Sequence, residues 1–539
     1  MINNELIMQT SAEACTQIAS YFDIVDNCVA MSDTNKQYSI NPQTSYSPSP
    51  PIQQGSYTSI IISPNSHNTA DLYNGFIKVN MKVKVNIDER FEPTNNNNNT
   101  LSTSNVGGYP FNRIWYGFKD ARDAVEKYEI VANGNTIYTQ NFACEESFLT
   151  SCCANETTKR ADIYSKARHK DIWNNKSGGR SGFIVDWKDT KEATDTIYLK
   201  IDLKRFLPLS NIKYLPAFAG KIELRLFFSC AGMVYCPLGP SMELKNEPSI
   251  YSKYTFEPIT AEFIPIGESI TCWVKSTAAG TAPNQAFTLN AGTRTSNVVE
   301  YVITDCLSII PCFGISDNIY NSLVQRYTDP THPLTFPTQT LSIYTTTNAL
   351  KNPSDKTTCT ITPRFVDSIF CLFPLHNRYK TVFKNPLFES FYINAGGYGN
   401  VPARPFGTTE KYPEFIEYCQ NAMNMNGEQS GFNKEVAASL TNKSGYNASL
   451  NYYSNDRSSF FIGLPTETDN TYQQGLTSLS PINFEINVSQ KTGEDTFADE
   501  VDTPPLLCLL YDASISILVQ PNGIPPLVRI GLYDLTSPE

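Results

Sequence analysis

The chain has 539 residues and a formal net charge of −11 at pH 7, with 18% charged and 12% aromatic residues. This acidic balance argues against a protein whose whole surface binds nucleic acid, although it allows one basic face. The sequence contains no run of about 18 apolar residues, so we expect no transmembrane helix. Its start lacks a basic region followed by an unbroken apolar region, so we expect no signal peptide and a chain kept in a reducing compartment.

The N-terminal region differs in composition from the rest of the chain. Residues 5–25 place apolar side chains at helical spacing and predict a helix. Residues 36–55 are rich in proline and serine, which is typical of an extended linker. We therefore expect residues 1–55 to form an N-terminal arm or linker.

Strand patterns dominate the remainder. In GFIKVNMKVKVN, residues 75–86, apolar residues alternate with lysine and asparagine, which predicts a half-buried strand. The same pattern predicts strands at 196–204, 221–228, 481–489 and 512–520, and a last strand is expected at 525–533. Helical spacing recurs only in DARDAVEKYEIV, residues 120–131, where we expect a short helix.

Long polar segments separate these strands, at residues 88–110, 132–180 and 377–456. Loops of such length are uncommon in a compact domain and are usually functional. We therefore expect these three segments to be functional, although the pattern does not indicate what they do.

A weak internal repetition suggests two similar domains. SGFIVDW (181–187), TIYLKIDLKRFLPL (196–209) and AGKIELRLFF (219–228) follow one another in the first half. SSFFIGL (458–464), SPINFEINVS (480–489) and LLCLLYDASISILVQ (506–520) follow in a similar order in the second half. The stretch KSTAAGTAPNQ, residues 275–285, is rich in small residues and turn formers, which suits a linker. We therefore expect two β-sandwiches, at residues 56–278 and 279–539.

Motifs of catalysis and of cofactor binding are missing from the sequence. No P-loop, no H-E-x-x-H and no G-x-S-x-G pattern occurs. The 14 cysteines include no C-x-x-C pair, and none of the four histidines pairs with another at metal-ligand spacing. The acids of DWKDTKEATD, residues 186–195, leave a carboxylate pair open, but a solvated loop is the simpler interpretation. We expect no enzyme activity, no cofactor and no metal.

One basic cluster stands out in the acidic chain. Basic residues with an aromatic among them can contact a nucleic-acid backbone, a neighbouring subunit or only solvent, and the pattern alone does not decide. The candidate contact residues are Lys166, Arg168, Lys170, Trp173, Lys176 and Arg180.

The stretch FLPLSNIKYLPAFAGKIELRLFFSC, residues 206–230, combines a proline-broken apolar run with an alternating strand. Because proline fixes its own backbone and restricts the residue before it, Pro208 and Pro216 predict a rigid structural elbow. A turn at Gly220 then leads into a half-buried strand.

This stretch resembles a segment of the major capsid proteins of Polinton-type elements and adintovirus-like eukaryotic DNA viruses. In that family a proline-led run, a loop and an alternating strand with arginine lie in the first of two jelly rolls. The matching residues here are Pro208, Leu209 and the strand from Lys221 to Phe228 with Arg225. LLYDASISILVQPNGIPPLVRIGLY, residues 509–533, is similar to the closing strands of the second jelly roll.

The resemblance implies an all-β fold of two tandem jelly-roll β-sandwiches with long inserted loops and few short helices. It implies a major capsid protein that forms a homotrimer, whose six jelly rolls make a pseudo-hexameric capsomer of an icosahedral shell. Neighbouring capsomers and penton or minor capsid proteins would be its partners. The protein would reside in the virion after synthesis and assembly inside the host cell. The elbow would lie at the base of the jelly roll, where subunits meet.

Other classes of protein remain open from the sequence. A carbohydrate-binding or carbohydrate-active β-sandwich has the same strand-rich composition. A capsid protein with one jelly roll and a large projecting domain is a second alternative, against which the internal repetition argues. A minor vertex protein, usually a single and shorter jelly roll, is a third.

Overall fold

The structure is a computed structural model of the chain. It describes residues 21–26, 41–44, 57–64, 68–86, 93–95, 113–116, 121–152, 183–184, 192–228, 234–237, 254–257, 264–265, 272–278, 285–289, 299–329, 332–350, 355–374, 383, 388–406, 461–466, 475–490, 503–520 and 524–532.

Eight strands of the N-terminal half form two four-stranded antiparallel sheets. One has the order β1-β18-β4-β10 and the other the order β2-β12-β7-β8. In chain order the eight are strands B to I of a jelly roll, because the two sheets then read B-I-D-G and C-H-E-F. Their bounds are β1 Asn41–Thr44, β2 Tyr57–Ile62, β4 Phe76–Asn86, β7 Val125–Ala132, β8 Asn135–Gln140, β10 Glu192–Asp202, β12 Ile222–Phe228 and β18 Val299–Ile310.

Eight strands of the C-terminal half repeat this arrangement. The sheets β20-β27-β22-β25 and β21-β26-β23-β24 again read B-I-D-G and C-H-E-F in chain order. A ninth strand, β28, pairs with residues 513–518 of β27, beyond the stretch of β27 that pairs with β22. The bounds are β20 Leu334–Thr345, β21 Lys356–Ile361, β22 Val366–Leu372, β23 Phe388–Ala395, β24 Asn400–Phe406, β25 Phe461–Pro465, β26 Ile482–Gln490, β27 Leu506–Leu518 and β28 Leu527–Leu532. The chain is therefore an all-β tandem of two jelly rolls.

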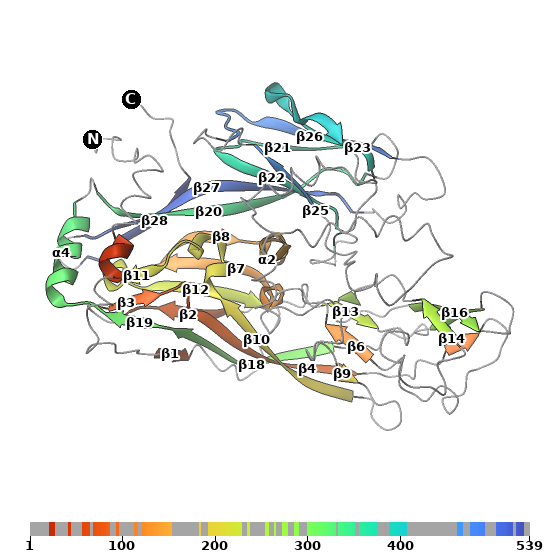
Figure 1. The fold of residues 1–539 in the computed structure, drawn as a ribbon, viewed down its shortest axis with the longest axis horizontal. Coiled ribbons are helices and arrows are strands. Elements are labelled where there is room, and N and C mark those ends of the chain that lie inside the picture. The colour runs from red at the N-terminus through yellow and green to blue at the C-terminus, as the bar shows by residue number, and fades with distance from the viewer. Residues whose placement is uncertain are drawn as a thin grey trace.

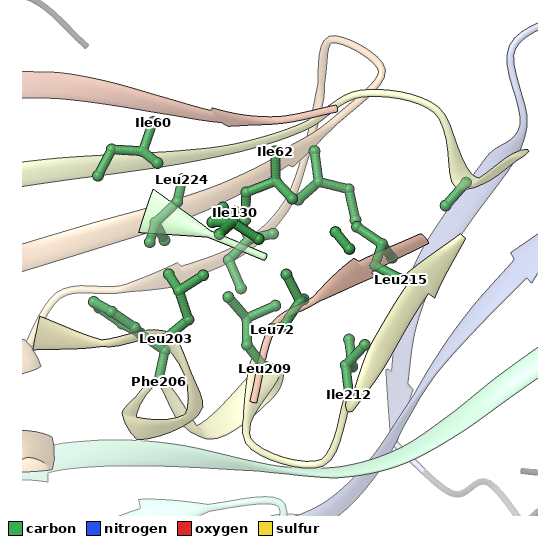
Figure 2. Packing of buried hydrophobic residues seen from close by; sticks show 14 of the residues in the cluster. Ile60, Ile62, Leu72, Ile130, Leu203, Phe206, Leu209, Ile212, Leu215 and Leu224 are labelled. Atoms are coloured by element: carbon green, nitrogen blue, oxygen red, sulfur yellow. The ribbon is translucent and has the colours of Figure 1, made fainter. Parts of the chain in front are cut away.

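The core of the first jelly roll fills the space between its two sheets. Alternate residues of β12 point inward, with Leu224 fully buried between the sheets. Ile60, Ile62 and Ile130 come from neighbouring strands and pack around it, as Figure 2 shows. Burying one such aliphatic side chain contributes about 1.5–3 kcal/mol, which is why the alternating pattern fixes which face points inward.

The B-I-D-G sheet of the second jelly roll is buried on both faces. Leu507 and Leu509 of β27 belong to the core between the two sheets. Cys508 and Leu510, on the opposite face, pack against residues of the first jelly roll. In Figure 1 this sheet lies between the β21-β26-β23 sheet and the first jelly roll.

Connections of the first jelly roll carry further strands and helices. Two additional four-stranded sheets have the orders β15-β13-β6-β9 and β14-β16-β17-β5, and a three-stranded sheet has the order β11-β3-β19. Helix α2 (Ala143–Cys152) follows β8, and helix α4 (Asp317–Tyr327) joins the two jelly rolls. The bounds of these strands are β3 Asn68–Asp71, β5 Pro93–Asn95, β6 Arg113–Tyr116, β9 Phe183–Ile184, β11 Tyr214–Pro216, β13 Val234–Pro237, β14 Tyr254–Glu257, β15 Ile264–Pro265, β16 Cys272–Ala278, β17 Gln285–Leu289 and β19 Cys312–Gly314.

The strands expected from alternation are confirmed. The predicted segments correspond to β4, β10, β12, β26, β27 and β28. The helix expected at 120–131 is wrong: a short 3-10 turn at Ala121–Ala124 leads into strand β7. The β-branched residues Val125, Ile130 and Val131 pair with β12 in the sheet, and this tertiary pairing overrides the helical spacing. Of the helix expected at 5–25, residues 21–26 are helical and the others lie outside the described residues.

Two of the segments interpreted as long loops contain regular structure. Residues 132–180 include strand β8 and helix α2, and residues 377–456 include strands β23 and β24. These strands and this helix are short, so their hydrophobic periodicity extends over only a few residues. The polar residues around them make that periodicity hard to recognise. Of the segment 88–110, only β5 is described.

Strand pairing also bears on the expected domain division at 278/279. Residues 279–284 join β16 to β17, which pair as a hairpin. Strand β18, which follows, pairs with β4 in the first jelly roll, and β1, expected in the arm 1–55, pairs with β18. We therefore propose that the first jelly roll begins near residue 41 and that the division lies between β18 and β20.

The internal repetition indicates the right number of domains but equates the wrong strands. TIYLKIDL belongs to β10, strand G of the first jelly roll, and its counterpart in the second is β25, within SSFFIGL. AGKIELRLFF contains β12, strand H, whose counterpart β26 lies in SPINFEINVS. The pattern is offset by one strand because half-buried strands share the same alternation whatever their place in the sheet.

Candidate functional site: the junction between the two jelly rolls

The predicted elbow is the connection between strands β10 and β12 of the first jelly roll. It runs through 3-10 turns at Leu203–Arg205 and Leu207–Leu209, strand β11 and a further turn at Ala217–Ala219. Pro208 lies in the second turn and is buried together with both of its neighbours. Pro216 ends β11, which pairs with β3, where its missing N–H costs no ladder hydrogen bond at the strand's end. Both prolines thus lie buried in a connection that is itself largely buried.

The elbow packs against the second jelly roll of the same chain. The hydroxyl of Thr338, on β20, lies 2.9 Å from the carbonyl oxygen of Leu207 and 3.0 Å from that of Pro208, so its single proton is shared between them. The Leu207 side chain joins a buried cluster with Phe148 and Leu149 of helix α2. The cluster's other members come from the outer face of the β20-β27-β22-β25 sheet and from Phe383. The described contacts of Pro208 therefore lie between the two jelly rolls.

A buried carboxylate holds the elbow from the side of the first jelly roll. Glu146 of α2 is fully buried and accepts hydrogen bonds from Arg122 at 3.1 Å and from Gln140 at 2.9 Å. The hydroxyl of Tyr128 donates to both of its oxygens, and the backbone N–H of Leu207 donates to it at 3.4 Å. Burying a charged carboxylate is costly unless it accepts several hydrogen bonds, and Glu146 accepts such a set.

The same network reaches the second jelly roll. The second amide proton of Gln140 goes to the carbonyl oxygen of Leu341, on β20, at 2.8 Å, and the hydroxyl of Tyr138 donates to the same oxygen. Burial first, and then the negative charge of Glu146, raise the pKa of Tyr128 and of Tyr138. Both phenols are therefore protonated hydrogen-bond donors at neutral pH.

A helix near the N-terminus covers the other end of the junction. In the helix formed by residues 21–26, drawn in red in Figure 1, Tyr21 is fully buried and its ring meets those of Phe336 on β20 and Tyr327 on α4. Its hydroxyl also lies 3.3 Å from that of Thr69, on β3 of the first jelly roll. The ring of Phe22 packs on Tyr214 of β11. This helix therefore contacts both jelly rolls.

Asp26 fixes the end of this helix on the elbow. Its carboxylate accepts a hydrogen bond from the Tyr214 hydroxyl at 2.6 Å. It also forms an ion pair with Lys213 at 2.8 Å. Desolvation alone would raise the pKa of Asp26, but the hydrogen bonds from Lys213 and Tyr214 lower it overall. The bond with Asp26 in turn raises the pKa of Lys213, and burial together with Asp26 raises that of Tyr214 to about 12.

The predicted basic cluster lies outside the described residues. This holds for each of its six members, Lys166, Arg168, Lys170, Trp173, Lys176 and Arg180. The structure thus brings Pro208 and Pro216 into one junction and leaves the basic cluster as a prediction.

Sequence reasoning missed the polar groups of the junction. Glu146 lies in a segment interpreted as a loop, and the sequence of α2, ACEESFLTSC, has only a weak amphipathic pattern that could have indicated a helix. The uninterrupted apolar run LLCLLY, residues 506–511, also signals a strand buried on both faces, and hence a sheet covered by a second layer.

Two searches for other kinds of site concern only the part of the chain that the structure describes. Within it, no group of three or more histidine, cysteine, aspartate or glutamate residues could hold a metal ion. None of its helices is both long and apolar enough to cross a membrane.

The strand orders and the shared junction define the chain as a double jelly-roll protein. Solved structures of viral proteins are similar over most of its length. The Sputnik virophage structure, determined by cryo-EM, is 11% identical, covers 92% of this chain and 89% of that chain, and has a TM-score of 0.46. The mavirus major capsid protein is 10% identical, with 93% and 91% covered and a TM-score of 0.46. The Faustovirus major capsid protein is 8% identical, with 97% of each chain covered and a TM-score of 0.41.

No protein-family profile and no curated protein sequence matches the chain. The assignment of the fold rests on the order and pairing of its own strands.

Proposed function

We propose that this chain is a major capsid protein, located in the virion, that trimerises into pseudo-hexameric capsomers of an icosahedral shell. The observation that carries the proposal is the tandem of two complete jelly rolls held together by a buried polar and apolar junction. Jelly rolls occur in capsid proteins, lectins and cupins, and a fixed pair of them suits a building block.

Rigidity of the pair is the physical link between fold and function. Three copies of a chain with two similar units can close into a ring of six such units, provided that the two units keep a constant orientation. The network around Glu146 and the hydrogen bonds of Thr338 connect the two jelly rolls through buried groups. Such groups cannot be exposed without a large desolvation or unpairing cost, so they favour one orientation.

Partners follow from this role. Neighbouring copies of the trimer would surround it in the shell, and penton or minor capsid proteins would occupy the positions where six-fold packing fails. The basic cluster between Lys166 and Arg180 is the candidate contact with a neighbouring subunit or with nucleic acid. Assembly would take place inside the host cell.

The solution mass of the purified protein tests the proposal. Light scattering should give about three times the 60.2 kDa of one chain, and negative-stain images should show hexagonal particles. A monomer of 60.2 kDa that does not assemble at any salt concentration or pH would overturn the capsid proposal. A glycan-binding screen would then test the alternative of a carbohydrate-binding β-sandwich, because lectins share the jelly-roll architecture.

A further inference from the structure

Strand β2 lies at one edge of the C-H-E-F sheet of the first jelly roll. It pairs with β12 along one side, and its other side pairs with no strand in the part of the chain that the structure describes. An edge strand of an antiparallel sheet leaves alternate backbone N–H and C=O groups unpaired, which makes it a template for a further strand. Natural proteins protect such edges with charged residues, with proline or with a covering segment.

Within the described residues, β2 has none of these protections. Its sequence, YTSIII, contains no charged residue and no proline. Among the other edge strands of the two jelly rolls, β1, β20 and β25 contain proline, β10, β21 and β28 contain charged residues, and β24 contains both. Strand β8 lacks them too, but the second jelly roll covers it, because Tyr138 and Gln140 bond the carbonyl oxygen of Leu341.

The side chains of β2 leave an uncharged edge beside solvent. Ile60 and Ile62 point into the core, as Figure 2 shows. Tyr57, Ser59 and Ile61 alternate with them on the outer face, and Tyr57 is 50% exposed. An aromatic ring exposed on an unpaired strand is typical of a surface that a partner covers.

The charged side chains of the same outer face lie on the inner strands β12 and β7 and neutralise one another. Arg225 pairs with Glu223 at 2.9 Å and with Glu129 at 3.7 Å. Lys127 pairs with Glu129 at 2.7 Å. A neutral strand can therefore approach β2 without meeting an unpaired charge, and a second copy of β2 is such a strand.

Side-chain alternation restricts how two copies of β2 can pair. In an antiparallel pair, directly opposed side chains point to the same face, so the two core-facing sets must coincide. The register that places Ser59 opposite Ser59 of the second copy meets this condition. It also places Tyr57 opposite Ile61, which is a favourable cross-strand pair of an aromatic and a β-branched residue. The next permitted register, with Ile60 opposite itself, would face Ile61 with Ser59 instead.

We propose that the β2 edges of two copies pair antiparallel across a two-fold axis, with Ser59 at the axis. The pairing joins two C-H-E-F sheets into one continuous sheet and covers the Tyr57 ring of each copy. One short edge strand buries less surface than the roughly 1,200 Å² at which stable interfaces begin, so a single pairing is weak. It suits a contact between capsomers that is made several times at once, and in this role the inference rests on the proposed function.

A lysine on the edge tests the pairing. Ile61 lies opposite Glu223 of β12, so the side chain introduced by Ile61→Lys has an acid beside it within its own sheet. Its charge should block a second strand and raise the concentration at which capsomers associate in sedimentation velocity by about tenfold or more. Thr139→Lys is the matched control, because Thr139 lies opposite Glu129 on β8, the other edge of the same sheet. It should associate like the wild type, and thermal melting should show both variants folded.

A cysteine at the axis tests the register. Opposed residues of antiparallel strands have Cα atoms about 4.5–5.5 Å apart, which lies within the roughly 4.4–6.8 Å that a disulfide spans. With an added oxidant, Ser59→Cys should therefore give linked pairs of chains on a non-reducing gel. Ile61→Cys is the control, because Ile61 faces Tyr57 in this register and lies about 13 Å from the other Ile61, too far for a disulfide. It should link no more than the wild type.

The outcomes separate this inference from the proposed function. A wild-type trimer whose Ser59→Cys variant stays unlinked would overturn the edge pairing and leave the capsid proposal standing. Equal linking of the Ser59→Cys and Ile61→Cys variants, or equal weakening by Ile61→Lys and Thr139→Lys, would also overturn it. A wild-type protein that stays monomeric would overturn the capsid proposal and with it the role of the pairing between capsomers.

Discussion

The hydroxyl of Thr338 in the second jelly roll hydrogen-bonds the carbonyl oxygen of Pro208 in the first, 130 residues earlier in the chain. Both residues are buried, so this is a contact inside the protein and not a surface bond. A proline expected to shape a connection within one domain thus also supplies a hydrogen-bond acceptor that joins two domains.

Removing this hydroxyl should weaken the protein. Thr338→Val keeps the shape of the side chain but leaves the Pro208 carbonyl without its donor, which we expect to lower the free energy of unfolding by about 1–3 kcal/mol. Thr338→Ser keeps the hydroxyl and loses one methyl group, so its effect should be smaller. Urea unfolding measures both, and a Ser variant as damaging as the Val variant would contradict the hydrogen-bond explanation.

The buried ion pair between Arg122 and Glu146 predicts a larger loss of stability than the Thr338 hydroxyl does. Glu146→Gln leaves the positive charge of Arg122 in the interior without its carboxylate, and breaking such a pair costs about 3–5 kcal/mol. The Arg122–Glu146 side chains are 1% and 0% exposed. The pair between Lys356 and Glu485, whose side chains are 60% and 32% exposed, provides the control, and Glu485→Gln should leave the unfolding midpoint in urea close to that of the wild type. Equal midpoints for the two variants would contradict a special role for Glu146.

Strands could be predicted from the sequence where one face of the strand is buried in the core and the other faces solvent. The alternation of Lys221, Glu223 and Arg225 with Ile222 and Leu224 predicts β12 because solvent and core impose a period of two.

The junction between the two jelly rolls could not be predicted in the same way, because the burial and hydrogen bonds of its residues depend on segments distant in the sequence. Glu146 is buried only because α2 lies between the two jelly rolls, and Thr338 finds its acceptors in a segment far away in sequence. Neither residue has a local pattern that distinguishes it from an exposed glutamate or threonine. Our proposed shift of the domain division has a related basis, because the small residues of 275–285 suit a hairpin turn as well as a linker.

The proline elbow predicts different effects on folding and on assembly. Pro208 and Pro216 restrict the unfolded chain, so replacing both with alanine should lower the free energy of unfolding by roughly 0.4–1 kcal/mol for each residue. We expect assembly, measured by light scattering against protein concentration, to weaken by about tenfold or more, because a less rigid junction disturbs the orientation on which ring closure depends. An equal proportional loss of folding and assembly would count against this role.

The attachment of the N-terminal helix predicts a dependence on pH. Because the pKa of Asp26 is lowered in the folded protein, its stabilising contribution is present above the unfolded value of about 4 and is lost as the pH falls through the folded value. The pKa of Lys213 is raised, so its contribution is present below the unfolded value of about 10.4 and is lost as the pH rises through the folded value. Between these limits the pair is complete.

Asp26→Asn should therefore destabilise the protein near neutral pH, and its effect should be smaller at about pH 3, below the unfolded pKa of Asp26. The side chains of Asp26 and Lys213 are 47% and 39% exposed, so solvent screening limits the difference to about 1 kcal/mol or less. Asp23 lies exposed on the same helix and provides the matched variant Asp23→Asn, which should not reproduce this pH dependence. Hydrogen exchange of residues 21–26 at both pH values locates the effect, and equal protection in the wild type and the Asp26→Asn variant at neutral pH would show that Asp26 does not hold the helix.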